Sequence, residues 1–130
     1  MSENFNLEII SPDQTIIKTE TKQVTLPSFE GLMGILKDHI SLVTFLRPGL
    51  IETETDKGRE KFFVEEGIVE FNNNHLLILS STAINVKSLS KNIIDKMIQV
   101  SEETISNKDI KDKEKYVLSY KIDTLKEIRQ

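Results

Sequence analysis

The sequence predicts an N-terminal antiparallel β-sandwich followed by a C-terminal antiparallel α-helical hairpin. Three observations support this prediction. As far as Lys87, apolar and polar residues alternate in short runs, as strands with one buried face require. Gly, Pro and Asn separate these runs and supply turns. From Ser88 to Gln130 there is neither Gly nor Pro, and apolar residues recur every three or four positions, which is typical of amphipathic helices.

The first strand is predicted where Phe5, Leu7 and Ile9 alternate with polar neighbours. Ser11-Pro12-Asp13 follows as a turn, because Pro fixes φ and the Ser or Asp side chain can bond the local backbone. Further strands are predicted at Ile16–Thr19, Gln23–Leu26, His39–Leu46, Gly49–Thr55, Lys61–Glu66, Ile68–Phe71, His75–Leu79 and Ile84–Lys87. Many short strands favour a sandwich or barrel, since each strand can bury only one face.

Two helices are predicted after the strands. In the first, Leu89, Ile93, Met97 and Val100 form one apolar row, with Ile94, Ile98 and Ile105 beside it, and Ser88 or Ser90 can cap its start. The second is predicted from Lys113 to Arg129, beyond a break at residues 106–109. Residues 1–87 are thus predicted to form the sandwich and 88–130 the hairpin. Because an isolated helix pair is marginally stable, the hairpin should dock on the sandwich or on a partner.

Composition narrows the function classes. The chain has 130 residues and no Cys, which excludes disulfides and thiolate metal sites. Up to Ser88 there are 13 acids and 8 bases (−5), and beyond it 8 acids and 9 bases (+1), matching the net charge of −4. An acidic front half argues against nucleic acid as a partner. No apolar run is long enough to cross a bilayer and no signal peptide precedes the first strand, so membrane association is expected only through a partner.

The residues that usually carry catalysis are not arranged for it. Glu65 and Glu66 are adjacent in a predicted strand, so they should face opposite sides and cannot act as an acid/base pair. No Gly-x-Ser-x-Gly elbow is present, and Gly31-Leu32-Met33-Gly34 lacks the Lys and Ser/Thr of a phosphate loop. We therefore predict no enzyme activity, no metal and no cofactor. The Phe62-Phe63 pair is predicted to supply one core ring and one exposed ring.

Two segments carry motifs that the alternation of apolar and polar residues in a strand does not require. In Glu30–Ile51, an acid and Gly precede a Gly-Ile step, a His-led run and Arg47-Pro48-Gly49; in Gly67–Ile84, Gly-Ile-Val-Glu precedes Thr-Ala-Ile. In this order and spacing the sequence resembles the epsilon subunit of F-type ATP synthases, the counterpart of the mitochondrial delta subunit. The resemblance extends from Phe5 to the final helix. It implies a non-catalytic rotor subunit of the central stalk, which binds the gamma subunit and the ring of c subunits.

The resemblance also implies particular contacts. His39, Ser41 and Thr44 would contact gamma, although a His at a strand end can instead bond a backbone carbonyl. Strand alternation places His39 and Ser41 on one face and Thr44 on the other. Glu30, Leu32 and Met33 would rest on the c-ring; many relatives carry an acid directly after the first Gly, where this chain has Leu32.

For the hairpin, the resemblance implies a regulatory role. Basic side chains would meet acidic surfaces of the catalytic alpha and beta subunits and restrain ATP hydrolysis; the candidates are Lys111, Lys113, Lys115, Lys121, Lys126 and Arg129. Some relatives bind ATP through an Ile/Leu-Asp-x-x-Arg-Ala motif, but the matching stretch Leu89–Ile94 has Ser90 and Ile93 in place of the Asp and Arg. Nucleotide binding is therefore not expected. The implied location is peripheral, on the cytoplasmic face of a bacterial inner membrane, rather than the organellar equivalent.

Two other functions are compatible with this composition. A free-standing β-sandwich module that binds a carbohydrate or peptide is one, but such modules usually expose a row of aromatic rings, and this chain has no Trp and few rings to spare. A small hydrolase is the other, but this chain lacks a recognisable nucleophile and base.

Overall fold

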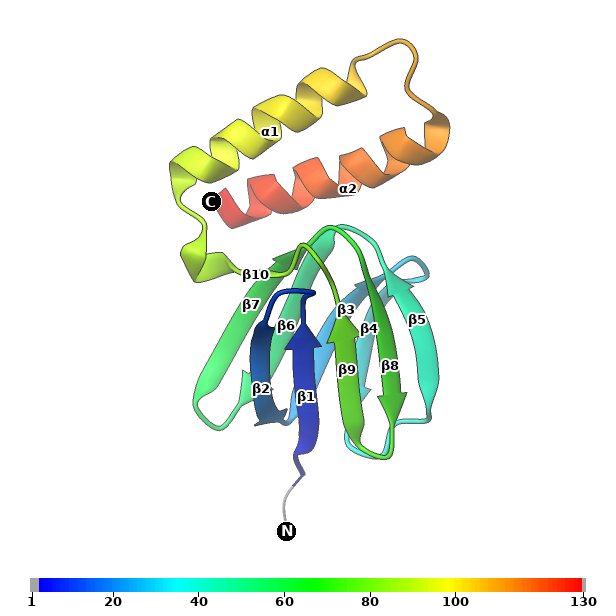
Figure 1. Cartoon of the computed structure of the whole chain (residues 1–130), viewed down its shortest axis with the longest axis vertical. Coiled ribbons are helices and arrows are strands. Elements are labelled where there is room, and N and C mark those ends of the chain that lie inside the picture. The colour runs from blue at the N-terminus through cyan, green and yellow to red at the C-terminus, as the bar shows by residue number, and fades with distance from the viewer. Residues whose placement is uncertain (1–2, 130) are drawn as a thin grey trace.

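The computed structural model describes residues 3–129, in which strands come first and helices last (Figure 1). Ten strands lie within these residues: β1 Phe5–Ile10, β2 Thr15–Thr21, β3 Gln23–Ser28, β4 Gly31–Leu36, β5 Leu42–Leu46, β6 Gly49–Thr55, β7 Gly58–Val64, β8 Gly67–Asn72, β9 His75–Leu79 and β10 Ile84–Asn85. A 3₁₀ turn at Val86–Ser88 leads into α1 Lys91–Ile105 and then α2 Asp112–Arg129.

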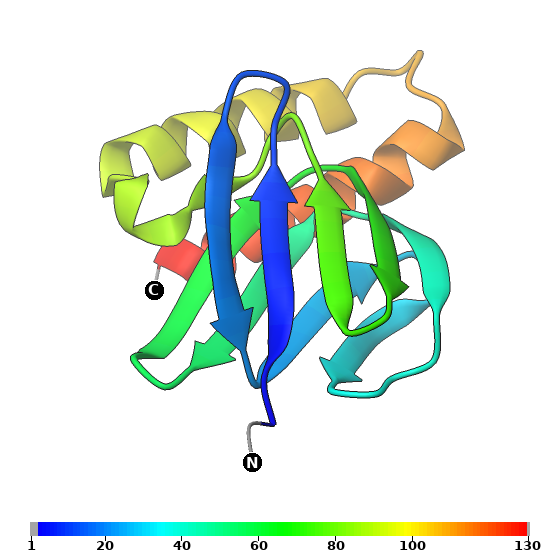
Figure 2. The ribbon, with the colours of Figure 1, turned by 60° about the horizontal axis from the view of Figure 1, so that its bottom comes forward.

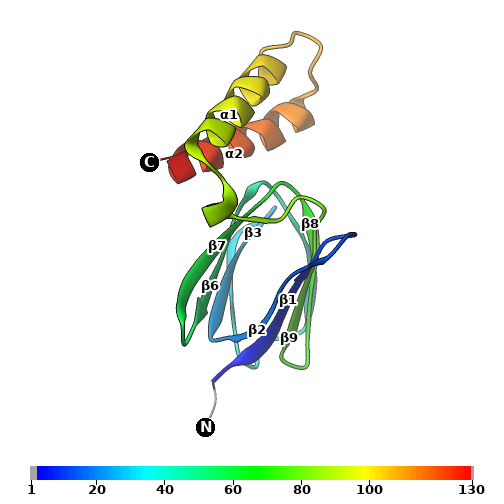
Figure 3. The same ribbon diagram turned by 60° about the vertical axis from the view of Figure 1, so that its left-hand side comes forward.

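The strands form two layers, seen edge on in Figure 3. One layer contains β10, β7, β6, β3 and β4, and the other contains β5, β8, β9, β1 and β2. The layers join where Ser28 of β3 pairs with Leu46 of β5. The strand pairs are antiparallel apart from β1 and β9, which run parallel with Asn6 opposite His75. The predicted sandwich followed by a helical hairpin is confirmed.

Alternation along the strands fills the space between the layers. The buried side chains of this core are Phe5, Leu7, Ile9, Val24, Leu26, Ile35, Leu46, Ile51, Phe62, Val64, Val69, Phe71, Leu76, Ile78 and Ala83. The rings of Phe5 and Phe71 meet edge to face, with centroids 5.6 Å apart. Burying a side chain of this size contributes about 1.5–3 kcal/mol relative to leaving it in water. The sandwich therefore has a complete core of its own.

Several sequence predictions about strands were wrong, including the end of the last one, because Val86 and Lys87 lie in a 3₁₀ turn. Residues 31–36, which are not among the predicted strands, form strand β4 along β3. The usual alternation was hidden there, because the outward positions Leu32 and Leu36 are apolar and Gly31 and Gly34 look like turn residues. The strand predicted from His39 begins only at Leu42, since Asp38 has a positive φ of 67° and turns the chain before it.

The helices lie side by side across one end of the sandwich, which we call the hairpin end (Figures 1 and 2). Ser90 caps α1, its side-chain oxygen accepting a 3.2 Å hydrogen bond from the Ile93 amide. The face of α1 that is buried is Ile94, Ile98 and Ser101, whereas Ile93 and Val100 of the other predicted row are about half exposed. Neither helix of residues 3–129 is long and apolar enough to cross a membrane.

A second, smaller core lies between the hairpin and the sandwich. Phe63, Ile94, Ile98 and Leu125 are its buried members. The expectation that one ring of Phe62-Phe63 is exposed was wrong, because Phe62 enters the first core and the hairpin covers Phe63. Adjacent residues of β7 thus face the two different cores, as strand geometry requires.

Candidate functional site

The adjacent carboxylates serve structural contacts. The strand predicted to include them ends at Val64, so Glu65 and Glu66 lie in the turn between β7 and β8. Glu65 Oε1 is 2.6 Å from Lys121 Nζ of α2. Glu66 Oε1 accepts hydrogen bonds from the amide and the hydroxyl of Ser81, at 2.9 and 2.8 Å. The two carboxylates are thus held by different partners, Glu65 by the hairpin and Glu66 by the segment after β9.

The outer face of β5, β8 and β9 exposes a row of apolar side chains. Phe45 lies opposite Ile68, which lies opposite Leu79 in the strand register. Their exposed fractions are 58%, 46% and 45%, and Val43 on the same face is 66% exposed. We call these four residues the apolar face. Outward strand positions are usually polar, so a contiguous group of this kind marks an interaction surface.

Away from the hairpin end, the same sheet face becomes polar. Glu70 lies between Val43 and the half-buried Leu77 in the strand register, and the next row toward the far turn pairs Asn72 with His75. His75 Nε2 is 2.8 Å from Glu8 Oε1, without the alignment of a hydrogen bond. A partner that covers this sheet would therefore make its apolar contacts close to the hairpin end and its polar contacts at the far end.

The residues predicted to contact gamma and the c-ring fall into separate places. Glu30 and Leu32 lie near the hairpin end, where the neighbouring Phe29 amide bonds Phe45 O at 3.3 Å. His39 and Ser41 lie at the far end, where Asp38 and Asn74 exchange two hydrogen bonds of 2.6 and 2.9 Å. The six residues of β4 separate the two places by about 20 Å, at ~3.3 Å per residue.

The other predicted interface residues differ in their surroundings. His39 packs edge on against Phe71 at 5.9 Å between centroids, and its Nδ1 contacts the Ile40 carbonyl at 2.8 Å. Ser41 Oγ donates to Asn72 Oδ1 at 3.2 Å. Met33 is half-buried against the sandwich core, and Thr44 is half-buried between the exposed Val43 and Phe45. Within β5, Thr44 lies on the opposite face from Val43 and Phe45, as strand alternation requires.

The hairpin is tied to the sandwich by two polar contacts from neighbouring residues of α2. Lys121 reaches Glu65, as described above, and the Arg47 guanidinium lies over the Tyr120 ring, 3.9 Å from its centroid. Tyr116 donates a 3.2 Å hydrogen bond to the Tyr120 hydroxyl, and this bond, followed by desolvation, raises the pKa of Tyr116. Arg47 is itself held by Nε donating to Ser28 O at 2.9 Å.

Comparison with known proteins identifies the family. Residues 4–86 match the family described as ATP synthase, Delta/Epsilon chain, beta-sandwich domain. The chain is 45% identical over 127 residues to an ATP synthase epsilon chain from Pelagibacter ubique, covering 97% of this chain and 98% of that protein. The chain belongs to the ATP synthase delta/epsilon family. The family predicted from the residue motifs is thereby confirmed.

Further relatives agree over the whole length. The epsilon chain of Parvibaculum lavamentivorans is 30% identical over 130 residues, covering 99% of this chain and 98% of that protein. Among solved structures, a chain of the Euglena gracilis mitochondrial ATP synthase (OSCP/F1/c-ring, rotational state 1) has a TM-score of 0.82 at 18% identity. That match covers 100% of this chain and 84% of the other. At this identity the structural likeness shows a shared fold, helical hairpin included.

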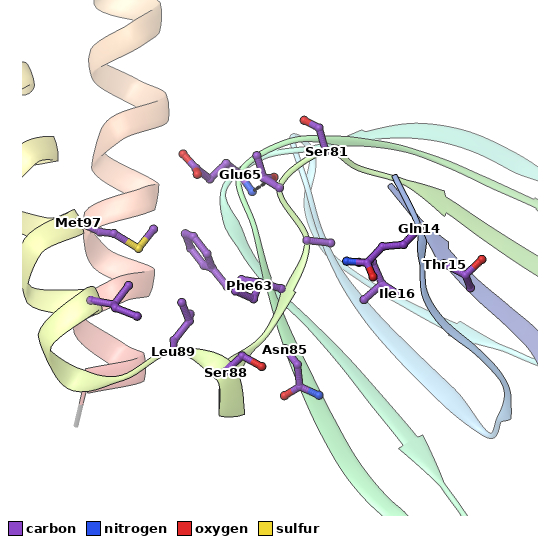
Figure 4. A pocket seen from close by; sticks show the side chains of 14 residues that line it. Gln14, Thr15, Ile16, Phe63, Glu65, Ser81, Asn85, Ser88, Leu89 and Met97 are labelled. Atoms are coloured by element: carbon purple, nitrogen blue, oxygen red, sulfur yellow. Dashed lines mark hydrogen bonds between the residues drawn. The ribbon is translucent and has the colours of Figure 1, made fainter. Parts of the chain in front are cut away.

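In this member of the delta/epsilon family, a groove of about 590 Å³ separates the sandwich from the start of α1 (Figure 4). Phe63, Leu89 and Met97 form its apolar wall, and Gln14 and Ser81 lie on the opposite side. The described lining contains no Lys or Arg and includes the Glu65 carboxylate. A phosphate group would find no cation there. In the segment that matches the nucleotide motif, Ser90 serves as a helix cap and Ile93 projects into the groove.

The six basic residues proposed for regulation divide into two groups in the structure. Lys121, Lys126 and Arg129 are engaged with Glu65, Glu102 and Asp95, at 2.6, 3.7 and 3.1 Å. Lys111, Lys113 and Lys115 are exposed and form no ion pair within residues 3–129. Only the second group is available to a partner while the hairpin is docked.

The apolar face itself was missed at the sequence level. A signal for it was present, because apolar residues stand at adjacent positions in Leu42-Val43, Phe45-Leu46 and Leu76–Leu79, and one buried strand face cannot take both members of an adjacent pair. In an antiparallel sheet with one face in water, the extra apolar residues must point outward.

Proposed function

We propose that this family member is the non-catalytic, epsilon-type subunit of the central stalk of a proton-translocating F-type ATP synthase. It binds the gamma subunit and the c-ring, and its C-terminal helices modulate ATP hydrolysis. The bacterial source of its relatives supports a peripheral position on the cytoplasmic face of the bacterial inner membrane.

The apolar face is the observation that carries the proposal for gamma. Phe45, Ile68 and Leu79 form one row, and about half of each side chain is in water. Covering the row recovers roughly half of the ~1.5–3 kcal/mol that full burial of each side chain contributes. Not all of this becomes affinity, because association costs translational and rotational freedom.

A stiff body supports a role in transmitting rotation. The two layers share a fully packed core and are joined at β3 and β5. Dense packing of this kind deforms little under load, because each displaced side chain disturbs several neighbours. A subunit clamped to gamma on one face can therefore turn with it as a single body.

For the c-ring, the proposed contact is the turn at Glu30 with Leu32 beside it. Leu32 is 74% exposed, and it stands where many relatives have an acid. Met33 faces the core, so Leu32 must supply the apolar part of this contact. The acidic part must come from Glu30.

The division of the chain near Ser88 into a gamma-binding sandwich and a regulatory hairpin is part of the proposal. It is supported by the two separate cores and by the helices' independent contacts. A fragment ending at Lys87 should fold, as followed by circular dichroism, and should bind gamma. A fragment that is unfolded would contradict this division.

The hairpin is proposed to act as a modest brake on hydrolysis. Lys111, Lys113 and Lys115 would contact acidic surfaces of the alpha and beta subunits, but acids such as Asp112 and Glu114 lie between them. Exposed ion pairs contribute about 0–1 kcal/mol each and weaken with salt. Deleting residues from Leu89 onward in the assembled enzyme should raise ATPase activity by a small factor, and high salt should reduce that rise. No change at any salt concentration would exclude the brake.

The gamma interface is tested by charging the apolar face. We expect Phe45→Asp in the full chain to weaken binding to purified gamma at least tenfold by calorimetry, because the carboxylate would be buried unpaired. The control is Leu36→Asp on β4, a similarly exposed apolar residue away from this face. Equal affinities of the two variants would rule out the assigned surface.

A further inference from the structure

The apolar face continues into a groove whose walls come from both parts of the molecule. Its volume is about 630 Å³. Phe29, Phe45 and Ile68 form the sandwich wall, and Lys113 and Val117 of α2 form the other. The groove exists only while the hairpin is docked, since α2 supplies one side of it.

The charged side chains that line this groove differ in whether they already have a partner within the chain. The carboxylate of Glu65 is engaged by Lys121, and that of Glu66 accepts two hydrogen bonds from Ser81. Among the charged lining residues, Lys113 is the one whose side chain forms neither an ion pair nor a hydrogen bond within residues 3–129. A ligand surface that fits the groove therefore presents apolar side chains to the two Phe rings and an acidic group to Lys113.

We propose that the surface for gamma is composite, and that gamma contacts α2 through this groove as well as the sandwich. This inference rests on the proposed binding of gamma to the apolar face. An apolar ridge of gamma that covers Phe45 and Ile68 also reaches Val117, and an acidic side chain on that ridge pairs with Lys113. Continuity of the groove with the apolar face identifies gamma, rather than a separate ligand, as the occupant.

A composite surface couples the binding of gamma to the docking of the hairpin on the sandwich. If gamma binds better when the hairpin is docked, the docked hairpin is stabilised by gamma by the same factor, because linkage between binding free energies is reciprocal. Gamma then holds the hairpin against the sandwich and keeps it from other partners. Release of the hairpin requires the loss of these contacts.

Hydrogen exchange of the full chain provides the direct test. Addition of purified gamma should slow the exchange of amides in residues 112–120 several-fold, in addition to protecting β5 and β8. In the Phe45→Asp variant neither region should gain protection. Protection of β5 and β8 without any change in α2 would overturn the composite surface and leave the proposed function intact.

Charge reversal on α2 gives a second test that does not disturb packing. Lys113→Glu should weaken gamma binding about threefold to tenfold, whereas Lys115→Glu, also exposed and without an ion pair, should change it by less than twofold. Val117→Asp should weaken binding more than Val100→Asp, which places the same charge at a more exposed valine on α1. Equal effects of the two lysine variants would overturn the proposal whatever Val117→Asp does, since that change can act by detaching the hairpin. Failure of Phe45→Asp to affect binding would instead reject the gamma interface itself.

Discussion

The two cores of this molecule differ in size and in what surrounds them. The sandwich core buries fifteen side chains between strands that are joined by backbone hydrogen bonds. The second core buries four, between a sheet end and a helix pair that contact one another through side chains. Strands that are joined by backbone hydrogen bonds around a large core unfold together, whereas a small core held only by side-chain contacts can open by itself. The comparison explains how one chain combines a rigid body with a releasable element.

The largest expected effect is in the first core. Phe71→Ala removes a buried ring that packs against Phe5, and it should lower the free energy of unfolding by about 3–5 kcal/mol. Urea denaturation followed by circular dichroism measures this loss. The matched control is Phe45→Ala on the apolar face, which should change stability by about 0.5 kcal/mol or less. A loss below about 1 kcal/mol for Phe71→Ala would mean that the sandwich core does not dominate stability.

A smaller and more local effect is expected in the second core. Leu125 is fully buried against the sandwich, and Leu125→Ala should cost about 2–3 kcal/mol, the lower part of the usual range, because several neighbours in this small core are only partly buried and can move to fill the space. Hydrogen exchange should accelerate in α1 and α2 but not in β8 or β9. The half-buried Leu118 supplies the control Leu118→Ala, with a weaker effect. Equal acceleration throughout the chain would show that the two cores unfold as one.

The difference between the cores also decides what could be predicted from sequence. The alternation of Phe5, Leu7 and Ile9 depends only on the local strand period, and the sequence predicted it correctly. The burial of Phe63 depends on where the hairpin docks, which no local pattern specifies. Likewise, α1 carries two adjacent apolar rows, and only docking selected Ile94 and Ile98 over the row of Ile93. Local periodicity determines where strands and helices form. Contacts between segments distant in the sequence determine which of their faces are buried.

The candidate site shows the same limit. Family motifs indicated the segments Glu30–Ile51 and Gly67–Ile84, and both contribute to the apolar face or its surroundings. They did not indicate that Phe45, Ile68 and Leu79 become neighbours, because that depends on the register of three strands. Nor did they show that His39 lies in a turn at the far end, which results from the positive φ of Asp38.

The polar contacts between hairpin and sandwich should contribute less than the second core. Lys121→Ala removes a partly exposed pair with Glu65 and should loosen the docked hairpin by about 1 kcal/mol or less. We expect the exchange of α2 amides to rise modestly at low salt, and the difference from the unmodified chain to shrink at high salt. Lys126→Ala, in a longer and more exposed pair with Glu102, is the control. If the two variants behave alike, Lys121 does not hold the hairpin.

The smallest expected effect is that of ATP, which should not alter the stability of either core. A nucleotide bound only to the folded chain at a hundred times its Kd would add about 2.7 kcal/mol, enough for a clear rise in Tm. The groove beside α1 offers no Lys or Arg to phosphates and presents the Glu65 carboxylate instead. Thermal unfolding with and without millimolar ATP should therefore coincide. The double variant Ser90→Asp with Ile93→Arg restores the Asp and the Arg of the family motif while Asp retains the cap, and it should acquire an ATP-dependent rise in Tm. A saturable rise in the unmodified chain would show that ATP is held by residues outside the family motif.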